Sequence, residues 1–222
     1  MTPSRFAARR LVIDDATLTV RQIRPDDRDA LRAAFHKLSP ESRYRRFQGH
    51  VSDLSPAMLR YLTEVDGSDH FAVVAVLERR GGAPLLPFAS FVRRRASAEL
   101  VGVARLIKLP SNMAEVAITV ADAFQGRGLG AELMEILVKQ ARKSGIDTLV
   151  AHVLSNNEPM MRLLRTAGPV RSLGDGAVAA TLARRDTRAI DRGRRRRLRA
   201  LRVGRVNFVL AMRWLRSQRR SA

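Results

Sequence analysis

Three glycines at alternate positions form the pattern in this chain that most clearly predicts chemistry. Gly126, Gly128 and Gly130 lie in the stretch QGRGLG, between a β-branched run and a helix-like run. Glycine costs conformational entropy on folding, so its repetition indicates positive φ angles or a close approach to the backbone. N–H groups of a curled loop at a helix N-terminus attract phosphate. The stretch therefore predicts a site for a phosphate-bearing ligand.

Other interpretations of this turn fit less well. A Walker A loop ends in Gly-Lys-Ser/Thr, which does not occur here. A dinucleotide-binding turn reads G-x-G-x-x-G/A, and Gly126, Gly128 and Ala131 satisfy it. That fold also needs an acidic residue at the end of the next strand, whereas residues 154–156 are Leu-Ser-Asn and Asp147 precedes the strand. A tight strand–helix turn that binds nothing is the remaining alternative.

A glutamate at the head of the same stretch is the candidate general base. Glu115 begins the strand that leads into the glycine turn, and its neighbours Met113, Ala114, Val116 and Ala117 are apolar. Burial among apolar groups raises the pKa of a carboxyl group toward the range in which it removes protons at neutral pH. A solvated glutamate at the end of a strand is the alternative interpretation.

Periodicity and turn signals place these residues among alternating strands and helices. Helices are expected from Pro25 and over residues 41–47, 57–65, 129–145 and 158–167. Strands are expected over residues 17–24, 70–78, 99–108, 114–122, 148–155, 170–173 and 177–183. This order predicts the α/β class, with a mixed α+β sheet in one domain.

We expect the domain to span residues 17–183, between an N-terminal segment at 1–16 and an arginine-rich amphipathic tail at 184–222. Residues 79–95, with Gly-Gly, prolines and basic clusters, are expected to form an exposed connection.

The motifs of this chain resemble those of the GNAT superfamily of N-acetyltransferases. The acyl-coenzyme A loop of that family reads Q/R-x-x-G-x-G/A, and QGRGLG (125–130) fits it at every position. Over residues 17–183 the chain is similar to bacterial Pat-like protein-lysine acetyltransferases, through LSPESRYRRF (38–47), LSPAMLRYLTEVD (54–66) and NNEPMMRLLRTAG (156–168). One departure is the Gly-Pro that follows the last of these segments where the family has Gly-Phe.

The resemblance implies a single GNAT-type acyl-CoA N-acyltransferase fold and direct transfer of an acetyl group from acetyl-CoA to an amine, with protein lysine as the expected acceptor. It implies that Glu115 is the catalytic base. No tyrosine lies on the second coenzyme-side helix, so the general acid of many superfamily members has no counterpart. The residues implied in binding acetyl-CoA are Ile118, Thr119, Val120, Gln125, Gly126, Arg127, Gly128, Leu129, Gly130, Ala131 and Asn157.

Two other functions stay open from the sequence. A small amine is the alternative acceptor, and a non-catalytic acetyl-CoA-binding module tethered by its tail is the alternative to an enzyme. No metal is expected, because the chain has no cysteine and its four histidines lack metal-ligand spacing.

The charge of the chain is concentrated in its tail. After residue 183 there are 15 arginines and two aspartates, which supply +13 of the net charge of +20. A basic amphipathic helix binds anionic membranes, RNA or acidic partners, and docking on its own domain is the alternative. With no signal peptide and no apolar run of ~18–20 residues, we expect a cytoplasmic protein, with peripheral attachment at the inner membrane face as the variant.

Overall fold

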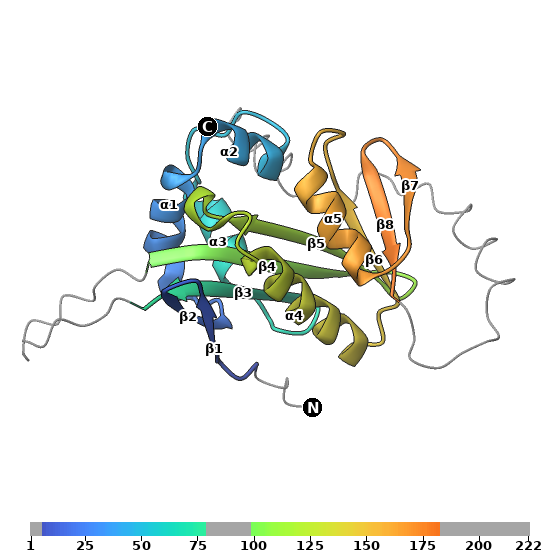
Figure 1. Ribbon diagram of the computed structural model, residues 1–222, viewed down its shortest axis with the longest axis horizontal. Coiled ribbons are helices and arrows are strands. Elements are labelled where there is room, and N and C mark those ends of the chain that lie inside the picture. The colour runs from blue at the N-terminus through green and yellow to red at the C-terminus, as the bar shows by residue number, and fades with distance from the viewer. Residues whose placement is uncertain (1–5, 79–98, 183–222) are drawn as a thin grey trace, which may run out of the picture.

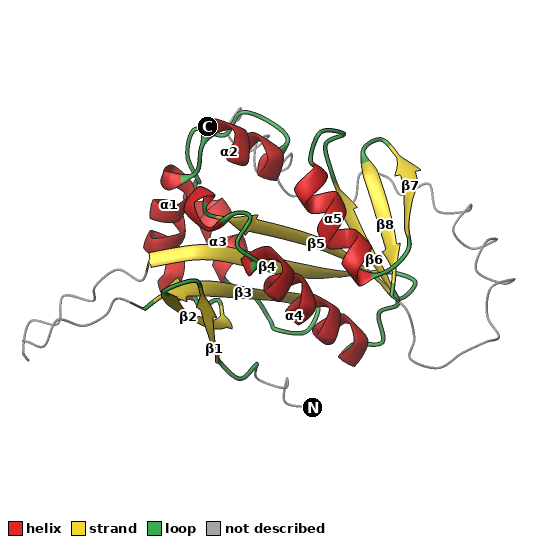
Figure 2. Ribbon diagram, viewed as in Figure 1, coloured by secondary structure: helices red, strands yellow, loops and turns green. Residues whose placement is uncertain are grey.

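A mixed β-sheet lies at the centre of the molecule, with helices on both of its faces (Figures 1 and 2). The structure is a computed structural model that describes residues 6–78 and 99–182. The strands are β1 (Arg9–Ile13), β2 (Ala16–Gln22), β3 (His70–Leu77), β4 (Glu99–Leu109), β5 (Met113–Val120), β6 (Thr148–His152), β7 (Val170–Gly174) and β8 (Ala177–Thr181). The helices are α1 (Arg28–Lys37), α2 (Pro40–Phe47), α3 (Pro56–Thr63), α4 (Leu129–Lys143) and α5 (Glu158–Ala167).

The strands are arranged in the order β1-β2-β3-β4-β5-β6-β8-β7. Every neighbouring pair is antiparallel except β5 and β6, which are parallel. Parallel neighbours need a long crossover connection, and α4 supplies it. The segment that contains the glycine turn therefore lies between β5 and β6, the two strands of the parallel pair.

Both faces of the sheet are buried, which explains why β3 is apolar along its whole length. Phe71, Val73 and Ala75 pack in the core under α4 and α5. Ala72 and Val74 point the other way, into the core under α1 and α3. We call these two faces the α4 face and the α3 face.

The α4 helix follows from a regular apolar stripe. Leu129, Leu133 and Leu137 are fully buried, and the helix ends before Gly145, whose φ of +70° allows the chain to turn away. Gly102 on β4 allows this close packing, since a Cβ atom there would lie 3.1 Å from Leu133 Cδ1.

The helices α2 and α3 begin with the same capping chemistry. The hydroxyl oxygens of Ser39 and Ser55 accept hydrogen bonds from the N–H groups of Ser42 and Met58, and a proline occupies the first helical position of each. The α2 helix packs beside β5, which places its residues at one wall of the site described below.

The mixed α/β fold predicted from the sequence is confirmed, and α5 spans the predicted residues 158–167. The strand β1 was not predicted: it pairs with β2, so the sheet begins at Arg9 and not at residue 17. Val12, an apolar residue that is 69% exposed, breaks the alternation that would have indicated this strand. The strand expected over residues 114–122 ends at Val120, and the one expected over 148–155 ends at His152.

The expectations for the basic tail at 184–222 and for the connection at 79–95 lie outside the described residues. In the described part of the chain, no helix is long and apolar enough to cross a membrane.

Candidate active site

The strands β5 and β6 pair along three residues and then separate. Residues 113–115 of β5 pair with residues 148–150 of β6, while β5 continues to Val120 with no described strand on that side. Apart from Val120 O, which accepts a hydrogen bond from the Gln125 side chain, the backbone groups of residues 116–120 on that side are left for another partner. A cavity of about 850 Å³ lies at this opening, a volume typical of ligand sites.

The wall of this main cavity combines α2, β5, the glycine turn, the end of β6, α5 and the β7–β8 turn. Most of the residues predicted from the sequence line it: Glu115, Ile118, Thr119, Val120, Gln125, Gly126, Gly128, Gly130, Ala131 and Asn157. Arg127 and Leu129 do not line it.

The glycine turn has the geometry that only glycine adopts freely. The φ angles of Gly126 and Gly128 are +73° and +90°, and an added Cβ atom at either position would meet open space. Gly130 serves a second purpose, because a Cβ atom there would lie 3.2 Å from Leu163 Cδ1 of α5. Two glycines thus shape the turn, and the third also lets α4 and α5 approach.

The N–H groups of the turn are available to an anion. Within the described residues, the amides of residues 126–130 donate to no backbone carbonyl, whereas Ala131 N–H already donates to Gly128 O. They lie at the N-terminus of a helix of 15 residues, where the helix dipole adds positive potential. This combination suits a phosphate or pyrophosphate group.

Gln125 holds the turn in place. Its side-chain amide lies 3.1 Å from Val120 O, 2.9 Å from Asp122 Oδ1 and 3.1 Å from Ser42 Oγ of α2. Asp122 also accepts a hydrogen bond from Ser39 N–H at 2.7 Å. We call Asp122, Gln125, Ser39 and Ser42 the α2 latch. It fixes α2, and thereby one wall of the cavity, to the strand that leads into the turn.

Arg127 and Leu129 lie apart from the cavity for different reasons. The guanidinium of Arg127 pairs with Asp14, at 3.2 Å, in the β1–β2 turn. The side chain of Leu129 is fully buried in the core of the α4 face. Both residues belong to the sequence motif. In the structure, Leu129 can contribute only its backbone N–H group to the site, and the side chain of Arg127 lies on the outer surface of the turn.

Asn157 has two roles. Its Oδ1 accepts a hydrogen bond from Met160 N–H at 3.2 Å, so it is the N-cap of α5. The same residue lines the cavity, so its amide group borders the space opposite the glycine turn. Arg162, one turn further along α5, lines the cavity as well.

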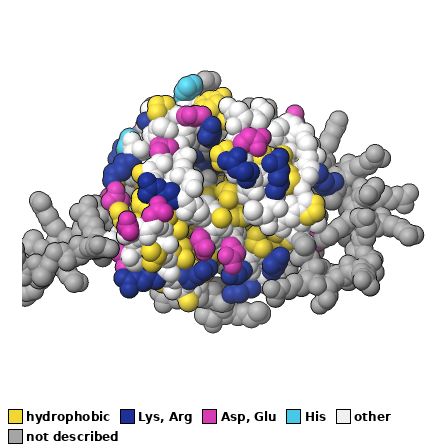
Figure 3. Space-filling view, in the orientation of Figure 1, with side chains coloured by type: hydrophobic (Ala, Val, Ile, Leu, Met, Phe, Trp, Pro, Cys, Tyr) yellow, Lys and Arg dark blue, Asp and Glu magenta, His cyan; other side chains and the backbone are white. Residues whose placement is uncertain are grey.

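Figure 3 shows that basic side chains gather over α5 on this face of the molecule. The α5 wall of the cavity therefore adds positive charge beside the turn.

Glu115 is a buried carboxylate in the wall of the same cavity. It is 6% exposed, which agrees with the desolvation predicted from its apolar neighbours. On β4, the residue opposite Glu115 is Ile107. Two residues further along β5, Ala117 lies opposite Arg105. Side chains that are opposite or two apart share a face of a sheet, so Glu115 and Arg105 both point to the α3 face.

A cluster of side chains from separate elements surrounds this carboxylate. Arg46 of α2 lines the cavity, and its charge interacts with that of Glu115. Burial lowers the pKa of Arg46 to about 10, although the nearby Glu115 acts in the opposite direction. Tyr61 of α3 also interacts with Glu115, and burial raises the pKa of its hydroxyl group.

The cluster continues into the core with Arg105, which is 1% exposed. Its guanidinium donates to Leu62 O at 2.6 Å and contacts the ring of His70. Burial and the neighbouring Arg105 lower the pKa of His70 to about 4, so this imidazole is neutral at pH 7.

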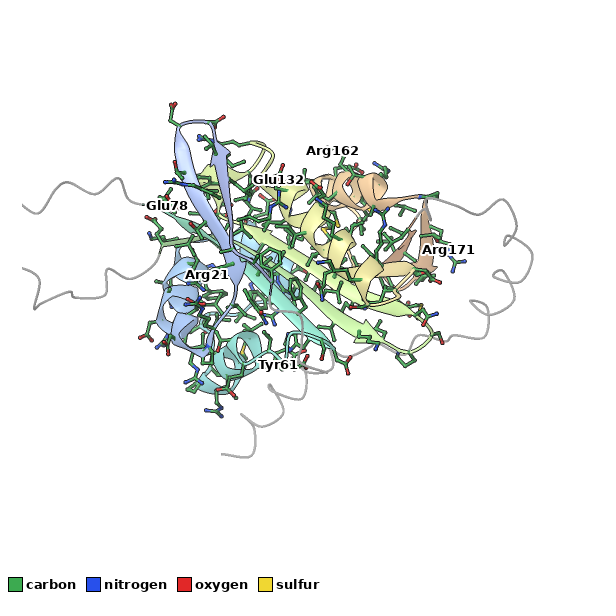
Figure 4. All side chains as sticks on the ribbon, turned by 90° about the horizontal axis from the view of Figure 1, so that it is seen from below. Arg21, Tyr61, Glu78, Glu132, Arg162 and Arg171 are labelled. Atoms are coloured by element: carbon green, nitrogen blue, oxygen red, sulfur yellow. The ribbon has the colours of Figure 1, made fainter. Side chains whose placement is uncertain are left out.

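Figure 4 shows Tyr61 and Arg162 on opposite sides of the sheet, one in the α3 layer and one in the α5 layer. None of Arg46, Tyr61, His70 and Arg105 was predicted from the sequence as a site residue. For Tyr61, His70 and Arg105 the signal was a polar or charged residue in an otherwise apolar element, whereas Arg46 lies in the polar helix α2 and had no such signal.

The far wall of the cavity offers further polar groups. His152, at the end of β6, and Asp175, in the β7–β8 turn, both line it. Burial lowers the pKa of His152, so its ring is neutral at pH 7. In the described part of the chain, the residues that line the cavity include no tyrosine.

The mixed sheet contains a parallel pair of strands that separate, and a helix N-terminus and a buried carboxylate lie at the opening between them. This is the arrangement of an acyl-CoA-dependent acetyltransferase. The sequence pattern of the acetyltransferase (GNAT) family matches residues 53–168, which is about half of the chain. The chain belongs to this family.

Individual proteins agree with this assignment. Acetyltransferase Pat of Mycolicibacterium smegmatis is 37% identical over 145 residues, 65% of this chain and 39% of that protein. Acetyltransferase PA5475 of Pseudomonas aeruginosa is 30% identical over 156 residues, 70% of this chain and 76% of that protein. The crystal structure of the GNAT domain of S. lividans PAT superposes with a TM-score of 0.63 at 29% identity, covering 78% of this chain and 94% of that domain. The chain thus spans less than half of the first relative but nearly all of the solved domain.

Proposed function

We propose that this protein transfers the acetyl group of acetyl-CoA to the side-chain amine of a protein lysine, with Glu115 as the general base. The observation that carries the proposal is that one cavity holds both a buried carboxylate and a glycine turn at a helix N-terminus. The first suits proton removal and the second suits the pyrophosphate of coenzyme A.

The coenzyme fits the cavity through groups that need no rearrangement. The amides of residues 126–130, which donate to no backbone carbonyl among the described residues, receive the pyrophosphate. The free side of β5 over residues 116–120 offers N–H and C=O groups to the amides of the pantetheine arm. Asn157 and Arg162 of α5 border the same space. The thioester is thereby directed toward Glu115 at the inner end of the opening.

The chemistry then follows from the position of Glu115. A lysine ammonium has a pKa of about 10.4, so its deprotonation at pH 7 costs roughly 4–5 kcal/mol. Glu115 accepts that proton, and the free nitrogen attacks the thioester carbonyl carbon. A backbone N–H group among residues 118–120 stabilises the oxyanion of the intermediate. The carbon–sulfur bond breaks, the thiolate takes a proton from water, and the new amide nitrogen loses its second proton to solvent.

Protein lysine is the proposed acceptor for two reasons. The chain resembles Pat-like protein-lysine acetyltransferases over most of its described residues. The acceptor-side wall, which carries Arg45, Arg46 and Gln48 from the end of α2, borders the same opening as Glu115, where an extended side chain can enter. We further propose that this reaction takes place in the cytoplasm, where acetyl-CoA and its protein acceptors are found together.

Incubation of the full chain with labelled acetyl-CoA and a cell lysate tests the proposal. We expect label on lysine residues of particular proteins, located by peptide mass spectrometry, and no such label with the Glu115→Gln variant. Label confined to small amines would move the function to the alternative acceptor. Tight binding of acetyl-CoA without any acetylated product would contradict an enzymatic function.

A further inference from the structure

A second, smaller cavity lies directly behind the main one, beneath α1 and α3. Its volume is about 60 Å³, which is room for a group of a few heavy atoms. Arg46, Phe47 and Thr119 line both cavities, so they form the boundary between the two. Most of the remaining lining is apolar, including Leu54 and Leu62, which are 2% and 4% exposed.

One wall of this inner cavity is Arg105, whose charge has little compensation. Its guanidinium donates to Leu62 O and contacts His70, both of which are neutral at pH 7. Its Nε atom is buried and has no hydrogen-bond partner, and no carboxylate pairs with Arg105 among the residues that the structure describes.

A buried cation of this kind is costly unless an anion approaches it. Burial and the charge of Arg46 lower the pKa of Arg105 to about 9, which leaves it a cation at pH 7 and indicates a region short of negative charge.

Arg21 is a partly buried arginine outside the cavities, and its charge is compensated within the protein. Its guanidinium forms two hydrogen bonds of 2.7 Å with the carboxylate of Asp27, which is itself 5% exposed. The neighbouring carboxylate raises the pKa of Arg21, against the effect of burial. The contrast indicates that the anion for Arg105 comes from a ligand.

The register of the sheet shows which part of a ligand reaches Arg105. Arg105 lies opposite Ala117, and Ala117 is two residues from Glu115 on the same face. Thr119, the next residue on that face, borders both cavities. An acyl group whose carbonyl oxygen is bound by a backbone N–H group among residues 118–120 lies beside Thr119, and it extends its far end past Thr119 into the inner cavity.

We infer that the inner cavity takes the terminal carboxylate of a short dicarboxylic acyl group, so that the enzyme uses malonyl-CoA or succinyl-CoA as well as acetyl-CoA. The inference rests on the proposed function, because it assigns the acyl end of the same site. The carboxylate accepts hydrogen bonds from Arg105 and lies near Arg46, while Phe47 and Leu62 contact the methylene carbons. The transfer step is unchanged: the carbon–nitrogen bond forms, the thioester carbon–sulfur bond breaks, and coenzyme A leaves as the thiolate.

A pair of thioesters with the same shape tests this in the unmodified full chain. Malonyl-CoA and acetoacetyl-CoA differ in one group, a carboxylate oxygen in the first and a methyl in the second. We expect malonyl-CoA to bind about tenfold more tightly than acetoacetyl-CoA by isothermal titration calorimetry, because a charge-assisted hydrogen bond distinguishes them. Mass spectrometry of an acylated lysine peptide should show the malonyl adduct.

Two variants of Arg105 locate the effect. Arg105→Met keeps the length and removes the charge, so it should bind both thioesters equally, while Arg105→Lys should keep part of the preference. Thermal unfolding with and without acetyl-CoA shows whether each variant is folded. Should Arg105→Met fail to fold, the comparison of the two thioesters in the unmodified chain still decides.

The acyl specificity and the acetyl transfer are tested by different outcomes. Equal affinity for malonyl-CoA and acetoacetyl-CoA in the unmodified chain, together with acetyl transfer from acetyl-CoA, would overturn this inference and leave the proposed function intact. Failure of every thioester to bind would overturn both.

Discussion

The two ends of the main cavity differ in which groups of the protein form them. The coenzyme end consists mainly of backbone: positive-φ glycines, the first amides of α4 and the unpaired side of β5. The acyl end consists of side chains from separate elements: Glu115 and Arg46 line the cavity, and Tyr61 and Arg105 lie behind them. A backbone site fixes a ligand by shape and dipole, whereas a cluster of buried charges sets the protonation states that chemistry requires.

This difference predicts that mutations at the two ends fail in different ways. A change at the coenzyme end should remove binding, and a change at the acyl end should remove turnover while binding persists. The α2 latch joins the two ends and should produce a third, milder effect.

The largest effect is expected at Glu115. Glu115→Gln keeps the size of the side chain and removes the base, so we expect kcat to fall about 10²–10⁴-fold while the Kd for acetyl-CoA changes less than about threefold. Steady-state kinetics and calorimetry measure the two quantities separately. Glu132→Gln, in the first turn of α4 outside the cavity lining, is the control for loss of a nearby negative charge. Equal turnover in the Glu115 variant and the unmodified chain at neutral pH would remove Glu115 from the mechanism.

The next effect is expected at the glycine turn. Gly128→Asp places a carboxylate, at φ +90°, where the pyrophosphate should lie, so acetyl-CoA affinity should fall at least about 100-fold. Gly145→Asp is the matched control, because Gly145 also has positive φ and open space around it but lies at the other end of α4. We expect the control to bind acetyl-CoA normally. Normal affinity in Gly128→Asp would contradict the placement of the pyrophosphate.

A smaller effect is expected on the pH dependence of the free energy of unfolding, through His70 behind the acyl end. The pKa of His70 is about 4 in the folded state and about 6.5 when unfolded. The unfolded chain binds more protons between these values, so stability is lost as the pH falls from 6.5 toward 4. At pH 5 we expect a loss of about 2 kcal/mol relative to pH 7. Urea denaturation of His70→Gln should show that this part of the slope has disappeared, whereas the exposed His50→Gln should retain it.

The smallest effect is expected at the α2 latch. In the folded state, hydrogen bonds from Ser42 and Ser39 lower the pKa of Asp122, against the effect of its partial burial. Asp122→Asn weakens the latch and loosens α2, so the KM for the acceptor should rise about threefold with little change in the Kd for acetyl-CoA. The exposed Asp69→Asn is the control. A larger loss in coenzyme affinity than in acceptor KM would show that the latch serves the turn and not α2.

The two ends also differ in how far the sequence predicts them. The coenzyme end is contiguous, so QGRGLG (125–130) at a strand–helix junction suffices to predict its position and its ligand class. Even there, the sequence could not show that Gly130 contacts Leu163 or that Arg127 pairs with Asp14, because both partners are distant in the chain.

The acyl end depends on the sheet register, which no local pattern specifies. Arg105 and Ala117 are opposite each other, and Arg46 reaches the same cavity from α2. Glu115 was predictable because it lies in the same strand as the turn. Its neighbours Arg46, Tyr61 and Arg105 were not, since they come from three other elements. The edge strand β1 was missed for a related reason, the exposure of Val12.

Hydrogen exchange at the backbone amides, with and without coenzyme A, tests the division between the two ends most directly. We predict slower exchange over residues 126–130 and 116–120 when coenzyme A binds, and unchanged exchange in α3 (Pro56–Thr63). Coenzyme A binding without protection of residues 126–130 would contradict the assignment of the glycine turn.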